Sequence, residues 1–451
     1  MEAKESTRTR IGFSRMEKKY EWKDHVIFMG ILLAMAVWVN RGIEIKGLYM
    51  DDLYFWSCYG EQSFLQYVFP VGSTRFRFLY YLAAWLEMAA VKNHVGWFVP
   101  FNILLNAAVS WSIYFVGRRL SRAKGIGFLC GLMFLISRMA YYQIGQVLGL
   151  METMALWMAV MILWYLFRYL NEKDSQIYFC LSCVLYFGVC FVHERYMALF
   201  PLLLLVLLFK KSRKLLEWGA GLLSFLLVQV IRAFTIGSIL PAGTGGTQVA
   251  DTFSLGDTFW YALSQIAYVF GINAGPEHLN GCPWGQSPLV IKVLVLLADA
   301  AIAVIVLAFV VKLAREKRKD YRIQMLKNST LFILFTGLCI ASSSVTIRVE
   351  MRWVYVSLVS ALLFLAYMYG ELTEGVKPEL YLKRLWPWGA AFACYVVFML
   401  PVELFYRADY PKLYLWPNQL RYNSLAEETY GRYGDRIFGK TIYIIGNSYE
   451  M

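Results

Sequence analysis

A succession of long apolar runs is the feature that most constrains this chain. A helix needs about 20 residues to cross the hydrocarbon of a bilayer, and runs of that order recur along most of the sequence. Since 59% of the 451 residues are hydrophobic and only 17% are charged, a soluble globular chain is excluded. The sequence predicts an all-α polytopic membrane protein. We predict eleven transmembrane helices, near residues 25–41, 97–117, 125–144, 148–168, 176–192, 197–210, 214–234, 289–311, 329–347, 353–370 and 385–405.

The net charge of +13 does not indicate nucleic-acid binding. The basic residues form short clusters beside the apolar runs, where they set the topology and meet anionic lipid headgroups. The basic N-terminal segment, residues 1–24, has no small-residue cleavage site before the first apolar run. We therefore expect that run to be a retained signal anchor, with a cytoplasmic N-terminus.

Residues 76–91 are apolar and could form a twelfth span. Without that span, the five loops predicted to be cytoplasmic carry 20 Lys and Arg, whereas the outer helix ends carry 6. A span at 76–91 would invert this ratio, against the positive-inside tendency. We therefore predict a first outer loop, residues 42–96, that holds two helices at the membrane surface. One follows Asp52, and the other runs from Arg75 to Val91.

The remaining organisation follows from the same topology. The membrane domain covers residues 25–405 and has a second large outer loop at 235–288. Its Gly-rich stretches, 243–246 and 271–281, follow no predicted strand and are interpreted as flexible loop. Residues 406–451 form a short extracytoplasmic segment with a predicted strand at 441–445. No retention signal is present, which favours a bacterial plasma (inner) membrane.

Two adjacent carboxylates, Asp51 and Asp52, follow the first apolar run and lie among aromatic residues. Ionisable groups at membrane depth are costly, and they usually face a cavity, a partner or a substrate. Basic candidates at similar outer depth are Arg75, Arg77, His193, Arg195, Arg348 and Arg352, with Glu194, Arg138, Gln143 and Glu152 as supporting polar groups. We predict that these groups meet in one site on the outer face.

A structural interpretation also exists for these residues. Glu194 could pair with Arg195, and Glu350 with Arg348 or Arg352, as ordinary ion pairs. The concentration of the set on one face, opposite two carboxylates, favours a site over isolated pairs. The aromatic residues after Asp52 could stack on a sugar, grip an isoprenoid chain or anchor the loop at the interface. These aromatic residues are Tyr54, Phe55, Trp56 and Tyr59.

A lipid-linked phosphate substrate fits acidic and basic groups in one place. Arginine binds phosphate through bidentate, charge-assisted hydrogen bonds and stabilises charge on a phosphate leaving group. A carboxylate can take the proton from an attacking hydroxyl. Such chemistry requires no cofactor. A divalent metal is compatible with the carboxylates, but no ligand spacing in the sequence indicates one.

These residues resemble the GT-C superfamily of membrane glycosyltransferases, which use polyprenyl-phosphate sugars and include bacterial aminoarabinose transferases and protein O-mannosyltransferases. Asp51-Asp52 matches the acidic pair of the family's first outer loop, and Arg75–Tyr81 resembles its basic surface-helix motif. Gly117–Lys124 resembles the inner turn, Ser137-Arg138 the end of the next helix, and Arg352–Tyr355 the late Arg-Tyr region.

The sequence also departs from that family. Phe78 replaces the expected Pro, and the Asp after the Ser-Arg helix has no match, so that Gln143 or Glu152 would take its place. No long C-terminal domain follows, which argues against the oligosaccharyltransferase branch.

The resemblance implies an inverting transfer from a polyprenyl-phosphate sugar to a hydroxyl on an unidentified glycan, lipid or protein. Asp51 would be the base and Asp52 would orient the site, although the two could exchange roles. Arg75, Arg77, Arg195 and Arg352 would bind phosphate, with Arg348 and His193 as second candidates.

Two other classes remain open. A transporter or lipid flippase would line a pathway with buried charges, and it often shows inverted repeats. A polysaccharide polymerase or ligase would use Arg and His of large outer loops, for which Arg232 and His278 are the candidates.

Overall fold

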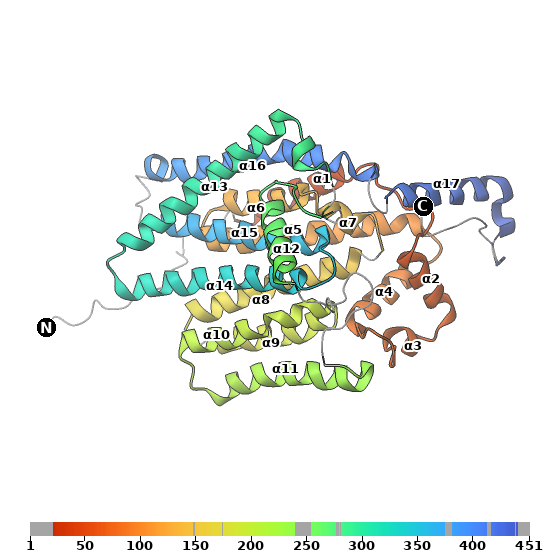
Figure 1. Ribbon diagram of the computed structural model, residues 1–451, viewed down its shortest axis with the longest axis horizontal. Coiled ribbons are helices and arrows are strands. Elements are labelled where there is room, and N and C mark those ends of the chain that lie inside the picture. Colours follow the sequence, from red (N-terminus) through yellow and green to blue (C-terminus); the bar gives the residue numbers. More distant parts are fainter. Residues whose placement is uncertain are drawn as a thin grey trace.

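The computed structural model describes residues 21–147, 149–173, 175–239, 254–276, 279, 281–374, 381–412, 416–437 and 439–440. Every regular element within those ranges is helical (Figure 1). The predicted strand at 441–445, the Gly-rich stretch 243–246 and His278 lie outside the described residues.

A helix is present at each of the eleven predicted spans. Eight of the helices in the described part of the chain are long and apolar enough to cross a membrane. Helices α6, α9 and α10 are shorter, so the count of eleven spans stays a prediction. The eleven helices are α1 (Glu21–Val39), α5 (Phe98–Ser121), α6 (Lys124–Ile136), α8 (Gly149–Asn171), α9 (Gln176–Cys190), α10 (Phe200–Lys210), α11 (Leu215–Ile236), α13 (Leu289–Arg315), α14 (Lys319–Ser344), α15 (Met351–Leu372) and α16 (Tyr381–Arg407).

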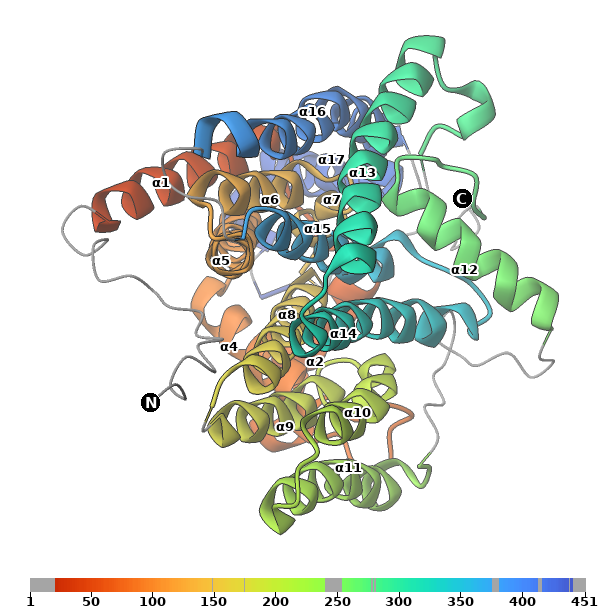
Figure 2. The same cartoon turned by 90° about the vertical axis from the view of Figure 1, so that its left-hand side faces the viewer.

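Helix α15 lies in the centre of the bundle, with α5, α6, α8, α13 and α14 packed around it (Figure 2). Most of its residues are buried, and its sequence is apolar on all sides, as expected for a helix enclosed by other helices. Near its end α15 crosses α5 closely. A Cβ at Gly370 would lie 2.1 Å from the carbonyl oxygen of Leu120, so only glycine fits this crossing.

The predicted span 125–144 is not one helix. Helix α6 ends at Ile136, the chain turns at Ser137–Met139, and α7 (Ala140–Ile144) follows as a short separate helix. The reason is a buried ion pair at the turn. Arg138 Nη1 donates to Glu403 Oε1 at 2.8 Å, and the backbone N–H of Arg138 donates to Glu403 Oε2 at 2.7 Å. A backbone N–H bonded to another helix cannot continue the ladder of its own helix.

The predicted first outer loop contains three helices, α2 (Asp51–Glu61), α3 (Phe64–Val68) and α4 (Phe78–Val91), followed by the 3₁₀ turn η2 (Val95–Trp97). They lie together beyond one end of the bundle, at the right of Figure 1. The basic turn between α13 and α14 lies at the opposite end. Their depth at a membrane surface stays a prediction.

The second predicted loop, 235–288, contains a helix that was not predicted, α12 (Leu255–Val269), which packs against α14 and α15. Three 3₁₀ turns connect later elements: η3 (Glu194–Leu199) between α9 and α10, η6 (Trp284–Gln286) before α13, and η8 (Tyr410–Lys412) after α16. The C-terminal segment forms α17 (Trp416–Tyr433) and η9 (Gly434–Ile437), and α17 lies at the same end as α2 (Figure 1).

Candidate functional site

A cavity of about 340 Å³ lies where α2 and α4 meet the ends of α8, α9 and α15. We call it the charged cavity. The sequence predicted five of its lining residues as site residues: Asp51, Arg75, Arg77, His193 and Arg352. The remaining lining residues are Tyr54, Phe55, Cys58, Gln62, Tyr67, Pro70, Ser73, Thr74, Tyr80, Tyr81 and Met151. The structure therefore brings together five of the predicted groups, which are far apart in the sequence.

The two adjacent aspartates have different environments. Both lie in the first turn of α2, where the helix dipole favours negative charge. Asp51 is exposed and lines the charged cavity. Asp52 is 3% exposed, and its Oδ2 accepts a hydrogen bond of 3.0 Å from the backbone N–H of Val147. Asp51 is thus the carboxylate that can reach a substrate, and Asp52 fixes the start of α2 against the chain before α8.

A buried ion pair connects the first outer loop to η3. Arg77 Nε donates to Glu194 Oε2 at 2.7 Å, and Arg77 Nη2 donates to Glu194 Oε1 at 2.6 Å. Burial alone would raise the pKa of Glu194, but the Arg77 guanidinium outweighs it and holds that pKa far below its usual range. This pairing differs from the expected Glu194–Arg195 pair, because the 3₁₀ turn directs these two neighbouring side chains to different partners.

Glu152 is the carboxylate around which the rest of the site is arranged. It is 1% exposed, and its Oε2 accepts a hydrogen bond of 2.8 Å from Arg195 Nη2. Its Oε1 lies 3.5 Å from His193 Nε2 and 3.9 Å from Arg352 Nε. One buried carboxylate of α8 therefore connects η3 and α15.

His193 is neutral in this environment. Burial and the nearby Arg77 guanidinium lower its pKa well below the usual range. The backbone N–H of Arg195 donates to His193 Nδ1 at 3.4 Å, which assigns the ring proton to Nε2, facing Glu152. His193 is thus a hydrogen-bonding group of the site, whereas the sequence had suggested it as a second candidate for phosphate.

A second carboxylate, Glu350, holds two arginines at the start of α15. Its Oε1 lies 2.8 Å from Arg348 Nη2, and its Oε2 pairs with Arg352 Nε. Arg352 Nη1 also donates to the hydroxyl of Tyr142 at 2.5 Å. Both ion pairs expected for Glu350 are therefore present. Arg352 additionally lines the charged cavity, whereas Arg348 is not among its lining residues.

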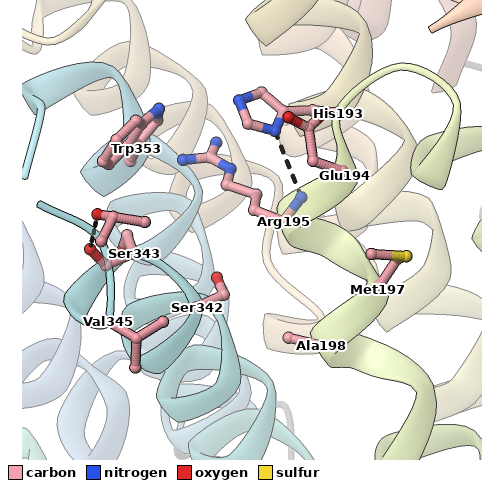
Figure 3. Close-up of a pocket in the computed structure, with 10 residues that line it drawn as sticks. His193, Glu194, Arg195, Met197, Ala198, Ser342, Ser343, Val345 and Trp353 are labelled. Atoms are coloured by element: carbon pink, nitrogen blue, oxygen red, sulfur yellow. Dashed lines mark hydrogen bonds between the residues drawn. The ribbon is translucent and has the colours of Figure 1, made fainter. Parts of the chain in front are cut away.

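A second cavity, of about 230 Å³, lies between η3 and the end of α14 (Figure 3). We call it the apolar cavity. Met197 and Ala198 form one wall, and Val345 lies on the opposite wall with Ser342 and Ser343. His193 lines both cavities, so they adjoin at its imidazole.

Arg195 reaches into the apolar cavity toward Trp353 (Figure 3). One of its nitrogens, Nη2, is bonded to Glu152 and to the hydroxyl of Tyr196. The other two, Nε and Nη1, are buried and have no hydrogen-bond partner among the residues that the structure describes. Buried N–H groups without acceptors are rare in native structures, and at such a place they indicate a ligand oxygen or water.

Several predicted site residues lie elsewhere or contribute indirectly. Arg138 is fully buried with Glu403, and its Nη2 donates to the carbonyl of Tyr268 at 2.6 Å, so it supports the bundle and not a cavity. Gln143 Oε1 accepts from the hydroxyl of Thr153 at 3.3 Å and lines neither cavity. Arg232, a candidate for the polymerase or ligase interpretation, is buried on α11.

Of the neutral residues that line the cavities, the sequence indicated Tyr54 and Phe55 and missed most of the others. Ser73 and Thr74 directly precede Arg75, and Trp353 directly follows Arg352, so proximity to a predicted arginine was the available signal for them. For Met151 and Val345 the sequence carried no such signal.

A further buried carboxylate, Glu87, lies on α4 close enough to Asp52 to feel its charge. It is 4% exposed, and neither of its carboxylate oxygens has a hydrogen-bond partner within the described part of the chain. Burial raises the pKa of Glu87 to about 8, and the charge of Asp52 raises it further. Glu87 is therefore protonated at neutral pH, which avoids a second negative charge beside Asp52.

No protein-family model matches the sequence, and no curated protein sequence matches it. Among solved structures, the chain is similar to the crystal structure of an Archaeoglobus fulgidus oligosaccharyltransferase tethered with an acceptor peptide containing the NVT sequon via a disulfide bond. The TM-score is 0.47 at 10% sequence identity, over 86% of this chain and 55% of that chain. This chain thus spans about half the length of that transferase.

We expect Arg77→Met to destabilise the protein by about 3–5 kcal/mol, because it leaves the buried Glu194 carboxylate without its partner. The double variant Arg77→Met/Glu194→Met should recover most of that loss. Unfolding of detergent-solubilised protein is the measurement. Arg168→Met, which breaks the half-exposed pair with Glu172, is the control and should cost less than about 1 kcal/mol. Equal costs for the two single variants would contradict a structural role for Arg77–Glu194.

The Glu87 carboxyl predicts a specific pH dependence of stability. Its pKa of about 8 lies above the ordinary value of 4.5, so the folded state holds the proton more tightly than the unfolded state. The resulting stability is complete below pH 4.5 and is lost as pH rises to about 8. Glu87→Gln should therefore lose less stability than the parent between pH 6 and pH 9 in thermal unfolding. The exposed Glu61→Gln is the control, and identical pH slopes for all three proteins would refute the prediction.

Proposed function

We propose that this chain is an inverting glycosyltransferase that moves a sugar from a polyprenyl-phosphate donor to an acceptor hydroxyl at the outer face of the membrane. The observation that carries the proposal is the composition of the charged cavity. One exposed carboxylate, Asp51, shares it with the guanidinium groups of Arg75, Arg77 and Arg352. A base and a set of phosphate-binding cations are the two components that such a transfer needs.

The proposed step uses Asp51 as the general base. Its carboxylate takes the proton of the acceptor hydroxyl while the hydroxyl oxygen forms a bond to the anomeric carbon of the sugar. The bond between that carbon and the phosphate oxygen breaks on the opposite face, so the configuration inverts. The electron pair of the broken bond leaves with polyprenyl phosphate, whose new negative charge the arginines stabilise.

The arginines contribute unequally to phosphate binding. Two nitrogens of Arg77 are bonded to Glu194, and the third donates to the sulfur of Met151 at 3.1 Å. Arg77 therefore contributes positive charge and part of the wall of the charged cavity. Arg195 lines the apolar cavity next to His193, the residue shared with the charged cavity, and offers two buried N–H groups there. We therefore assign the donor phosphate to the region between Arg195 and Arg352, with Arg75 on the side of Asp51.

The apolar cavity would hold the first isoprene units of the donor. It lies between η3 and the end of α14, and its walls carry Met197, Ala198 and Val345. An isoprenoid chain requires apolar walls next to the phosphate site, and the walls of the charged cavity are polar over much of their extent. The sugar would then occupy the charged cavity, beside Tyr54 and Phe55 of α2.

The same proposal includes the class of acceptor and the membrane in which the protein lies. The acceptor is a hydroxyl of a glycan, lipid or protein that approaches from the outer face. We place the chain in a bacterial plasma membrane, with a cytoplasmic N-terminus and an extracytoplasmic C-terminal segment. Base catalysis by Asp51 requires no metal ion or cofactor.

The decisive test is turnover of labelled polyprenyl-phosphate sugars by the purified protein and two aspartate variants. Asp51→Asn should reduce turnover by about 10²–10⁴-fold, the usual contribution of a general base. Asp52→Asn is the matched control, because an amide oxygen can still accept the N–H of Val147, and it should lose far less. Full activity in both variants would exclude this mechanism and would be expected for a flippase or a polymerase that does not use these carboxylates.

The two-cavity assignment predicts a dependence on the length of the donor chain. Ala198→Trp fills the apolar cavity, so it should raise the KM for a long-chain donor at least tenfold. It should have little effect on a water-soluble donor whose chain is a single isoprene unit. Leu208→Trp, on the exposed face of α10, is the control for a bulky residue at a lipid-facing position. An equal effect of Ala198→Trp on both donors would show that the isoprenoid chain of the donor does not occupy the apolar cavity.

A further inference from the structure

The C-terminal helix α17 is bonded to the backbone that leads into α2. Asn423 Oδ1 accepts hydrogen bonds from the backbone N–H groups of Lys46 at 2.8 Å and Gly47 at 3.2 Å, and its Nδ2 donates to the carbonyl of Glu44 at 2.8 Å. Gln419 Nε2 donates to the carbonyl of Gly47 at 2.6 Å. We call this arrangement of Gln419, Asn423 and residues 44–47 the α17 clamp. Both side chains are buried, so their bonds are shielded from water.

The contact continues from the clamp toward Asp51. Gly47 lies so close to α17 that a Cβ there would be 2.5 Å from the carbonyl oxygen of Tyr422. The rings of Tyr49 and Tyr422 lie 4.9 Å apart, and Asn418 Nδ2 donates to the hydroxyl of Tyr49 at 3.0 Å. Residues of α17 thus contact both the backbone of residues 44–47 and the side chain of Tyr49, and together these contacts fix the path of the chain through Tyr49.

The next residue, Met50, has an unfavourable backbone. Its φ of 51° and ψ of −123° place it in a region that residues with a Cβ rarely occupy. Such conformations persist only where the surrounding structure determines them, and they concentrate at functional sites. The residue before it is held by the α17 contacts, and the residues after it begin α2, where Tyr54 N–H donates to the carbonyl of Met50 at 3.0 Å.

The conformation of Met50 determines which aspartate faces the charged cavity. Successive residues of a helix lie about 100° apart around its axis. If the backbone of Met50 relaxed, the first turn of α2 would rotate. Asp51 would then move away from the charged cavity, and Asp52 would lose its hydrogen bond from the backbone N–H of Val147.

We propose that the α17 clamp positions the general base: Gln419 and Asn423 hold residues 44–47 so that Met50 keeps its strained backbone, Asp51 faces the charged cavity and Asp52 stays buried. The role of Asp51 as the base rests on the proposed function, whereas its placement by α17 does not. Gln419 and Asn423 line neither cavity, so they are positioning residues and not catalytic ones.

The first test measures the position of the aspartates without relying on activity. Carbodiimide coupling of an amine to the folded protein, followed by peptide mass analysis, should modify Asp51 at least tenfold more than Asp52. In Asn423→Ala this ratio should collapse toward one. Ser424→Ala is the matched control, because Ser424 is exposed and bonds only within its own helix, and it should keep the ratio of the parent.

The second test measures turnover of the polyprenyl-phosphate donor. Asn423→Ala should lower kcat at least tenfold and change the donor KM less than threefold, because Arg75, Arg195 and Arg352 lie on other elements. Replacing Met50 by glycine removes the cost of the positive φ. The double variant Asn423→Ala/Met50→Gly should therefore recover most of the labelling ratio and of kcat, which a variant with general structural damage would not do.

The outcomes separate the two proposals. An unchanged labelling ratio in folded Asn423→Ala overturns the clamp. A collapsed ratio with full kcat supports the placement of Asp51 by α17 and overturns its role as the general base. If the parent turns over no donor, the proposed function fails, and the labelling ratios still decide whether α17 places Asp51. If Asn423→Ala does not fold, Gln419→Ala removes one hydrogen bond and should shift the same ratio by a smaller amount.

Discussion

The end of the bundle that carries both cavities depends on a buried carboxylate, Glu152, which brings Arg195, His193 and Arg352 to one place. Removing a charged group from water costs several kcal/mol, so Glu152 is tolerable only with its cationic partner in close contact. The Arg77–Glu194 pair fulfils the same requirement between the first outer loop and η3. Each pair includes one residue of η3, and these two residues, Glu194 and Arg195, are neighbours in the sequence. This short turn therefore couples α8 and α15 to the start of α4. The cavities lie between these elements and keep their shape because the pairs keep the elements in place.

The hydropathy of the sequence predicted the helices well, since apolar runs of sufficient length have few alternatives in a membrane. It failed where a single polar contact decides the local structure. The break after Ile136 depends on Glu403, which is more than 260 residues from Arg138 in the sequence. Helix α12 is amphipathic and short, and its residues were interpreted as part of a loop because Gly-rich segments flank them. The break after Ile136 has no local signal in the sequence, whereas the amphipathic pattern of residues 255–269, preceded by Ser254 as N-cap, was a local signal for α12.

The composition of the site was predictable from the sequence, whereas its pairing was not. Charged residues at helix ends had to meet partners, so Asp51, Arg77, His193 and Arg352 were foreseeable as a group. The choice of Arg77 for Glu194, and of Arg195 for Glu152, follows from the direction of side chains in a 3₁₀ turn. The difference between Asp51 and Asp52 follows from the conformation of Met50 and the contacts of α17. Each of these is set by tertiary contacts, which neighbouring sequence does not encode.

The charge balance of the site bears on how it could select a phosphate. Glu194, Glu152 and Glu350 already partner Arg77, Arg195, Arg348 and Arg352, so there is little excess positive field to attract anions in general. Selectivity would then depend on directed N–H groups. Arg195 presents two of them, buried in the wall of the apolar cavity. In the proposed function, a phosphate that carries an apolar chain would bind these donors and fill this cavity, whereas a free anion would offer nothing to Met197 and Ala198. The same balance stabilises the buried charges themselves, because each of the three carboxylates is paired with an arginine of the protein.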